Sequence, residues 1–436
     1  MQSIRSSFKQ EFETLISLNS SSRLLVAVSG GVDSMVLCDL LLKTEYDFSI
    51  AHCNFQLRKQ DSDNDEKFVV QYCKKNNLTH YTKKFNVKEF KQSGNYSTQM
   101  AARNLRYLWF QELIHEYEFD FLLTAHHLND SLETFLINLS RGTGIDGLTG
   151  IKSKSQNVLR PLLSYSKEEI LKYANDNNLL WREDRSNSSI DYTRNKIRHK
   201  ITPILNEIHP NFLENFAQTI QNLNDYKSIT DNYIDSIWEK LSTEKNNIIS
   251  IQIEQLKDLK PLSVHLFHLF KDFKFTHPYE IEKLINSSNN GEIRSETHRL
   301  IKNRTELHLV RINENKVPDE INLEEDKIIE KPLYLRIEKS EVKDSVASET
   351  LDFEKIEFPL RIRKVKVGDT FTPLGMKGKK KLLKFFKDEK YSKLEKENAW
   401  LLVDAKDEIL YLIGKRIAEP FKCTEHTHKY LNIYLC

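Results

Sequence analysis

The sequence lacks paired cysteines and long apolar runs. It has five cysteines in 436 residues, and none forms a Cys-x-x-Cys pair or another zinc spacing. We therefore expect structural thiols in a reduced compartment rather than a disulfide framework. Residues 1–22 are polar where a signal peptide needs an apolar core, and no apolar run approaches the roughly 20 residues of a membrane span. A cytoplasmic protein without a membrane partner is expected.

The sequence also lacks an excess of either charge and shows no internal repeat. Because 65 Lys and Arg residues nearly balance 63 Asp and Glu, only local clusters can indicate a polyanionic partner. A chain of 436 residues exceeds one ordinary core and predicts two or three domains. We expect a catalytic domain at 1–210, a helical middle domain at 211–316, a linker at 317–358 and a basic C-terminal domain at 359–436.

Short apolar runs alternate with amphipathic segments in the first domain. This pattern is typical of an α/β fold with a parallel, Rossmann-like sheet. We predict a helical domain and a small basic α+β domain after it. Ligands of parallel sheets bind beyond the carboxyl ends of the strands, so the loops there should carry the chemistry. The expected strands are 24–28, 48–52, 79–85, 121–125 and 158–159, and the expected helices are 35–43, 66–76, 98–117, 131–141 and 167–177.

The turn Ser-Gly-Gly-Val-Asp-Ser at 29–34 follows the first predicted strand and opens a helix. Such a turn leaves backbone N–H groups unpaired at the positive end of the helix dipole, where an oligophosphate can bind. It is neither a Walker A loop nor a dinucleotide fingerprint. It resembles instead the pyrophosphate loop of ATP pyrophosphatases, which adenylate a substrate. We expect ATP at Ser29, Gly30, Gly31, Val32, Asp33 and Ser34.

Three carboxylates are candidates for catalysis. Asp33 is unusual in an anion-binding turn unless a divalent cation or an amine also binds there, so we expect Mg²⁺ at Asp33. After the fourth strand, Asp130 and Glu133 are three residues apart on a starting helix and share a face. They can hold Mg²⁺ or a substrate ammonium, or they are acidic residues that the helix dipole favours.

Three groups of basic residues are candidates for binding anions. Arg103 and Arg106 are three apart on a predicted helix and can clamp an anionic group, unless both are solvated. A segment with Arg194, Lys196 and Arg198 suits phosphate contacts with nucleic acid, the alternative being an exposed charged helix. Residues 361–390 contain 11 Lys and Arg against 3 Asp and Glu, a local net charge of +8.

In this order, the segments resemble the tRNA(Ile)-lysidine synthetases, a branch of the pyrophosphate-loop ATPases. The resemblance is close over 24–205, matches the middle only in type, and returns at 363–369 and in the Gly-Met-Lys-Gly stretch from Gly375. It implies a ligase that uses ATP and Mg²⁺ to adenylate the 2-carbonyl of the wobble cytidine in the CAU anticodon of tRNA(Ile). Free L-lysine then displaces AMP, and the resulting lysidine switches decoding from Met to Ile.

The resemblance also implies roles for the candidate residues. The lysine ε-amine, with a pKa of about 10.4, needs an anionic pocket and a proton acceptor, for which Asp33, Asp130 and Glu133 are candidates. Either Arg103 or Arg106 can hold the phosphate or the lysine carboxylate. The fold often pairs subunits, so a homodimer is also considered. The residues expected to bind tRNA are Arg194, Lys196, Arg198, Lys379, Lys380 and Lys381.

Three other functions compete with this hypothesis. A tRNA thiolase of the same class usually needs a catalytic cysteine pair or an iron-sulfur ligand set, which the sequence does not offer. A small-molecule amidating synthetase would not need a basic C-terminal domain. A non-catalytic RNA-binding protein would bind better without Asp33, Asp130 and Glu133.

Overall fold

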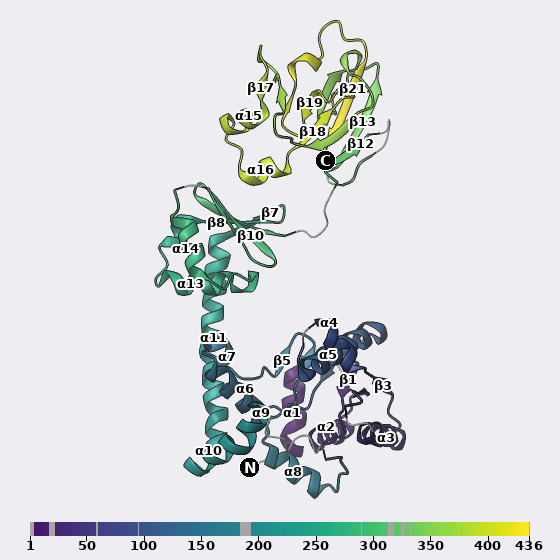
Figure 1. Cartoon of the computed structure of the whole chain (residues 1–436), viewed down its shortest axis with the longest axis vertical. Coiled ribbons are helices and arrows are strands. Elements are labelled where there is room, and N and C mark those ends of the chain that lie inside the picture. The colour runs from purple at the N-terminus through teal and green to yellow at the C-terminus, as the bar shows by residue number, and fades with distance from the viewer. Residues whose placement is uncertain are drawn as a thin grey trace. The chain divides into compact units, whose positions relative to one another are not determined.

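The computed structural model divides into two compact units, residues 1–232 and 233–436, with the boundary inside the long helix α11 (Phe212–Leu241). Each unit is described by itself. Figure 1 labels many of the helices and strands. The described residues are 4–16, 22–57, 60–94, 96–183, 193–288, 290–312, 318–323, 328–331 and 333–435.

The first unit contains a six-stranded sheet in the order β3-β2-β1-β4-β6-β5. Strands β3, β2, β1, β4 and β6 are parallel, and the edge strand β5 is antiparallel to β6. The predicted parallel α/β sheet is therefore confirmed, and each predicted strand lies within two residues of an observed one. The strands are β1 (Leu24–Ala27), β2 (Phe48–Asn54), β3 (His80–Lys84), β4 (Phe121–Leu123), β5 (Lys154–Ser155) and β6 (Val158–Leu159).

Helices cover both faces of this sheet, so its central strand is apolar along its length. Leu24 and Val26 of β1 pack into one core and Leu25 into the other, as the two-residue period of a strand requires. Figure 1 shows the sheet between α5 on one side and α2 and α3 on the other. The helices of this unit are α1 (Ile4–Ile16), α2 (Val32–Leu42), α3 (Gln60–Lys75), α4 (Val87–Gly94), α5 (Thr98–Tyr117), α6 (Leu128–Ser140), α7 (Ile145–Leu148), α8 (Lys167–Asp176), α9 (Thr193–Lys196), the π-helical turn η2 (Ile197–Ile201) and α10 (Thr202–Ile208).

The middle of the chain is not wholly helical, contrary to the prediction for 211–316. Its helices pack on an antiparallel sheet in the order β7-β8-β11-β10-β9. The strands bury alternate residues such as Leu307 and Leu309. This alternation extends over only a few residues, whereas the helical pattern of α11 extends over 30 residues and dominates the sequence of this region. The elements after α11 are β7 (Ser242–Lys245), β8 (Ile248–Gln252), α12 (Ile253–Lys257), α13 (Leu262–Phe270), α14 (Pro278–Asn286), β9 (Glu292–Arg294), β10 (His298–Asn303) and β11 (Glu306–Arg311).

The described part of the segment predicted as a linker, 317–358, belongs to the C-terminal fold. Its strand β12 (Glu320–Asn322) pairs with β15, and its strands β13 (Leu335–Ser340) and β14 (Glu349–Asp352) flank β21. The α+β class of this region is confirmed, but it begins before residue 359. Its other elements are β15 (Arg361–Lys364), β16 (Thr370–Phe371), β17 (Lys380–Lys381), α15 (Leu382–Asp388), α16 (Lys393–Asn398), β18 (Trp400–Val403), β19 (Ile409–Leu412), β20 (Arg416–Ile417) and β21 (Tyr430–Leu435).

Within the described ranges, no helix combines the length and the apolar character that crossing a bilayer requires.

One basic residue of the C-terminal region is internal. The side chain of Arg363 is 1% exposed and donates to Asp369 at 2.9 Å and to Asp407 at 2.8 Å. Burial acts to lower the pKa of this guanidinium, but the two carboxylates outweigh it and raise the pKa. Arg363 therefore holds the fold together, and it is not a surface charge.

Asp369→Ala removes one of the two carboxylates that hold Arg363. A buried guanidinium that keeps only one of its two carboxylates should lower the stability of the folded region by about 3 kcal/mol. Because a chain of several domains has no single unfolding transition, the measurement is hydrogen exchange of the amides of β18 and β19, with the exposed Lys384→Ala as control. Equal protection in the two variants would contradict a structural role for this pair.

Candidate active site

The turn after β1 has the backbone of an anion-binding site. Gly30 has a φ of +89°, in the left-handed region that glycine adopts without strain. Gly31 is the residue before α2, and glycine has no side chain with which to cap the helix. The Ser34 hydroxyl donates to the Gly31 carbonyl at 2.9 Å, and the Gly31 amide donates to Ser29 Oγ at 3.3 Å. The first N–H groups of α2 can therefore face an anion.

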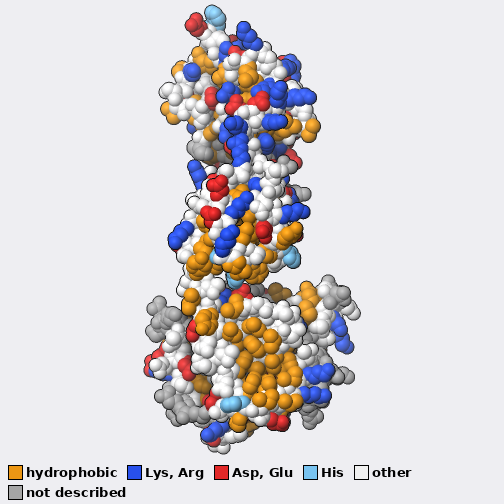
Figure 2. All heavy atoms as spheres, turned by 90° about the vertical axis from the view of Figure 1, so that its left-hand side faces the viewer, with side chains coloured by type: hydrophobic (Ala, Val, Ile, Leu, Met, Phe, Trp, Pro, Cys, Tyr) orange, Lys and Arg blue, Asp and Glu red, His pale blue; other side chains and the backbone are white. Residues whose placement is uncertain are grey.

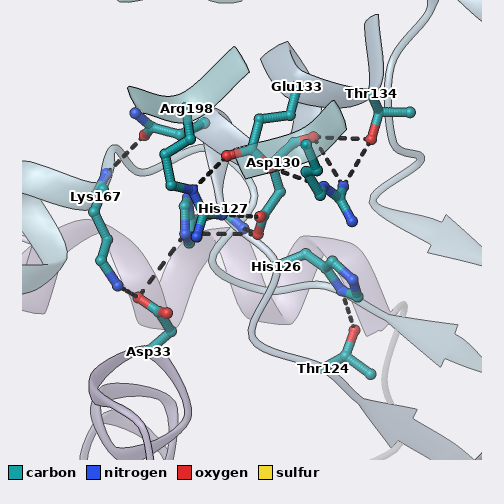
Figure 3. Close-up of polar contacts among 11 residues, drawn as sticks. Asp33, Thr124, His126, His127, Asp130, Glu133, Thr134, Lys167 and Arg198 are labelled. Atoms are coloured by element: carbon teal, nitrogen blue, oxygen red, sulfur yellow. Dashed lines mark hydrogen bonds and ion pairs between the residues drawn. The ribbon is translucent and has the colours of Figure 1, made fainter. Parts of the chain in front are cut away.

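Asp33 belongs to this turn and is already paired with a lysine. Lys167 Nζ lies 2.5 Å from Asp33 Oδ1, and both side chains are about one-third exposed. Lys167 stands in the first turn of α8, where its backbone amide donates to Asn129 Oδ1 at 2.9 Å. Figure 3 shows Lys167 and His127 reaching toward Asp33 from two different segments.

His127 lies between two of the predicted carboxylates. Its Nε2 is 4.0 Å from Asp33 Oδ1 and 3.6 Å from Asp130 Oδ2, and its side chain is 5% exposed. Asp130 Oδ2 also accepts from the His127 backbone amide at 3.1 Å. Burial acts to raise the pKa of Asp130, but His127, His126 and that backbone bond outweigh it and lower the pKa. Asp130 is thus an anion that both caps α6 and faces His127.

Glu133 is fully enclosed by two arginines. Its side chain is 1% exposed, Oε2 accepts from Arg194 Nε at 2.8 Å, and Oε1 accepts from Arg198 Nε at 2.7 Å. Arg198 Nη2 is also 3.4 Å from Asp130 Oδ1. Burial acts to lower the pKa of Arg198, and the bond to Glu133 leads the contacts that raise it. Both oxygens of Glu133 are therefore occupied by charge-assisted bonds, which tie α6 to the segment that contains Arg194 and Arg198.

The contacts of Arg194 and Arg198 differ from the predicted contacts with tRNA phosphates. Both side chains turn toward the carboxylates of α6, and Arg194 Nη2 also donates to Thr134 Oγ1 at 3.0 Å. Arg194 and Arg198 are four residues apart and lie in consecutive helical segments, so they can share a face. Lys196 lies between them and is exposed.

The other predicted anion-binding residues are less constrained. Arg103 and Arg106 are exposed, with their guanidinium groups 4.9 Å from the Tyr107 ring and 5.3 Å from the Phe55 ring. Arg103, Tyr107 and Arg160 line a cleft of about 220 Å³, and Arg106 does not. The structure therefore separates the two arginines that the sequence left equivalent.

The three predicted lysines of the C-terminal region are not alike. Lys379 and Lys381 are exposed. Lys380 pairs with Asp388 at 2.7 Å, and its side chain is 19% exposed.

His126 presents a second imidazole at the end of β4. Its Nδ1 is hydrogen-bonded to Thr124 Oγ1 at 2.9 Å. Burial lowers the pKa of His126 to about 4, and the guanidinium groups of Arg160 and Arg194 act in the same direction. The imidazole is therefore neutral at physiological pH.

Sequence reasoning did not assign roles to His127 or Lys167, although signals for both exist. The pair His126-His127 directly follows an apolar strand, at the edge where ligands bind. Lys167 follows the capping residue Ser166, and a cation in the first turn of a helix opposes the helix dipole. A lysine whose charge is unfavourable at the start of its own helix indicates an acidic partner in another segment.

A divalent cation finds a complete set of donors at this site only together with a nucleotide. Among the described residues, no three His, Cys, Asp or Glu side chains converge on one point as a metal site. Mg²⁺ is usually bound by one or two carboxylates plus substrate phosphates. Asp33, beside the free N–H groups of α2, matches that donor set.

Comparison with known proteins gives matches over both units. The PP-loop domain family matches residues 4–205, and the family described as the TilS substrate binding domain matches residues 244–312. The tRNA(Ile)-lysidine synthase of Parabacteroides distasonis is 33% identical over 425 residues, 95% of each chain. That of Bacteroides thetaiotaomicron is 34% identical over 413 residues, 93% of this chain and 94% of the relative.

Among solved structures, a tRNA thiolase from Methanococcus maripaludis is 19% identical and covers 50% of this chain and 78% of its own, with a TM-score of 0.41. A likeness at this level carries no argument about activity.

The His126 imidazole should stay neutral until the pH falls to about 4. Because its pKa in the unfolded chain is about 6.5, the unfolded state binds more protons between these two values. The stability that His126 contributes should therefore be lost as the pH falls through that window. NMR titration of histidine-labelled protein, with His126→Asn used to assign the resonance, measures the midpoint. A midpoint near 6.5 would show that the imidazole is not desolvated.

Proposed function

This chain belongs to the tRNA(Ile)-lysidine synthase family, and we propose from that premise that it ligates free L-lysine to the wobble cytidine of tRNA(Ile) with a CAU anticodon. The reaction would consume ATP and release AMP and diphosphate. The observation that carries the proposal is the convergence of an anion-binding turn, Asp33 and Asp130 on His127. A phosphate site and a set of carboxylates are what adenylation followed by attack of an amine requires.

The first step places the α-phosphate of ATP against the cytidine 2-oxygen. That oxygen attacks phosphorus, and diphosphate leaves. The turn at 29–34 supports this step with its backbone N–H groups and the hydroxyls of Ser29 and Ser34. Asp33 would hold Mg²⁺, which when bound offsets the charge of the phosphates. An adenylated oxygen leaves far more readily than a free carbonyl oxygen, and this difference makes C2 reactive.

In the second step, the lysine ε-amine attacks C2, and AMP departs with the former 2-oxygen. The amine must lose its proton, and both oxygens of Glu133 already accept hydrogen bonds from guanidinium groups. His127 suits this task better. Its Nε2 faces Asp33 and Asp130, the two carboxylates beside which the ammonium would lie. We assign the attraction of the ammonium to Asp130 and Asp33, and the positioning of helices to Glu133.

Arg103 is the better candidate for holding the phosphate or the lysine carboxylate. It lines the cleft that also contains Arg160 and Tyr107, whereas Arg106 lies over Phe55. An exposed guanidinium beside an open cleft can turn to an anionic ligand without losing a buried partner.

The contacts with tRNA are assigned to exposed cations. Lys196 lies close in sequence to the arginines that hold Glu133. Lys379 directly precedes β17 and Lys381 lies in it. Exposed lysines can neutralise backbone phosphates without breaking an internal ion pair.

A homodimer is a further part of the proposal. Figure 2 shows hydrophobic side chains gathered on one face of the first unit. Ile204 and Ile208 of α10 and Tyr226 and Ile229 of α11 are all more than half exposed. Exposed apolar groups of this kind are typical of protein interfaces, and a second copy would cover them.

We place the enzyme in the cytoplasm, where free thiols such as Cys38 and Cys73 persist.

The thiolase alternative fits the cysteines poorly. Cys38 and Cys73 are buried in the core of the first unit. Burial raises the pKa of both thiols, that of Cys73 to about 11. A sulfur carrier needs an accessible thiolate, which neither residue provides.

The central test is release of AMP and diphosphate that depends on both L-lysine and tRNA(Ile). Asp33→Asn should reduce this turnover by more than about 100-fold, because the charge that holds the metal and faces His127 is lost. The exposed Asp47→Asn is the matched control and should be unaffected. Turnover of Asp33→Asn equal to that of the control would exclude Asp33 from the mechanism.

The double variant Lys379→Ala, Lys381→Ala should weaken tRNA binding and leave ATP binding unchanged. The slope of log K against log salt should fall by about 1 to 2, one phosphate contact per lysine. Lys380→Ala is the comparison, and it should change the slope less because Lys380 already pairs with Asp388. A double variant with the wild-type slope would place tRNA elsewhere.

A further inference from the structure

Lys167 stands where its own helix disfavours it. It is the first residue of α8, after the capping residue Ser166, and the helix dipole favours acidic side chains at that end. The same turn contains Glu168 and Glu169, which follow the rule. Lys167 is the exception, and its ammonium reaches away from α8 to Asp33.

The position of Lys167 is fixed from two sides. Its backbone amide donates to Asn129 Oδ1 at 2.9 Å, which ties the start of α8 to α6. Ser166 and Glu169 form reciprocal hydrogen bonds that fix the first turn. Figure 3 shows the lysine side chain extended from this anchored backbone to the carboxylate. Because the backbone of Lys167 is fixed and its four-carbon side chain is flexible, the ammonium can move while the helix stays in place.

The anion-binding turn has no cation of its own. A Walker A loop includes a lysine that contacts the phosphates, but residues 24–42 contain no Lys or Arg. The turn instead includes Asp33, whose charge opposes an incoming phosphate. The positive charge at this turn must therefore come from another segment, and Lys167 is 2.5 Å from Asp33.

We propose that Lys167 is a phosphate-binding residue that exchanges its partner when nucleotide binds. In the free protein its ammonium neutralises Asp33. When a divalent cation takes Asp33, the ammonium moves to the triphosphate of ATP. This proposal rests on the proposed function only in taking ATP as the ligand. It explains how one carboxylate can lie in an anion site, since that carboxylate has a cation both before and after the nucleotide arrives.

The test is the affinity for a non-hydrolysable ATP analogue with Mg²⁺, measured by calorimetry. Lys167→Met should weaken binding by about 10- to 100-fold, the usual effect of losing one charge-assisted hydrogen bond. Lys167→Arg should restore part of the affinity. The exposed Lys172→Met on the same helix is the control and should bind as the wild type does. Adenosine, which has no phosphate, should bind all four proteins equally.

A second measurement follows the exchange itself. Without nucleotide, Lys167→Met should bind Mn²⁺ more tightly than the wild type, as seen by electron paramagnetic resonance, because the lysine no longer competes for Asp33. The double variant with Asp33→Asn should lose this gain.

Wild-type analogue affinity in Lys167→Met would overturn the inference, and so would an equal loss of adenosine binding, which indicates a purely structural effect. Unchanged Mn²⁺ affinity would also overturn it. If the wild type bound no ATP analogue at all, the proposed function would fail as well. If Lys167→Met bound the analogue with normal affinity while the wild type still formed lysidine, the inference about Lys167 would fail and the proposed function would stand.

Discussion

The parallel pairing of β1 with β4 brings the two halves of the site together. Leu24 lies opposite Phe121, and Val26 lies opposite Leu123, so both strands end at the same edge of the sheet. Asp33 follows one strand, and His127 and Asp130 follow the other, about a hundred residues later. Because neighbouring parallel strands are only about 4.8 Å apart, the two loops that follow them must share one edge.

This pairing concentrates charge, and the structure balances it locally. Asp33 faces Lys167, and Glu133 faces Arg194 and Arg198. Asp130 faces His127 and Arg198. Removing one partner of a buried pair leaves an uncompensated charge, which costs about 3–5 kcal/mol. In the Asp33–Lys167 pair both side chains are about one-third exposed, whereas Glu133 is buried between its two arginines, so charges can change partners at the lowest cost in the Asp33–Lys167 pair.

The sequence predicted most of the fold of the first unit because its signals are local. Apolar runs marked the strands, and the glycine turn marked the start of α2. The spacing of Asp130 and Glu133 placed them on one face of α6. The partners of Arg194 and Arg198 were missed because they lie about 60 residues away and no local pattern joins them.

The same limit explains the two errors outside the first unit. Strand β12 lies about 40 residues from its partner β15, and β13 and β14 lie about 80 or more from β21. Without its partner, an acidic, β-like segment reads as a linker. In the middle region, strands of three to six residues were hidden beside a helix of 30.

The local charge of the C-terminal region shows why a count of residues overstates a binding surface. This region has 11 Lys and Arg between 361 and 390. Of these, Arg363 forms ion pairs with Asp369 and Asp407, and Lys380 forms one with Asp388. Arg361 pairs with Glu320 at 2.5 Å. A cation already in an ion pair gains less from a phosphate, because the first bond must weaken before the second forms. The binding of a polyanion should therefore depend on the exposed lysines around the hairpin of β16 and β17, a smaller set than the net charge suggests.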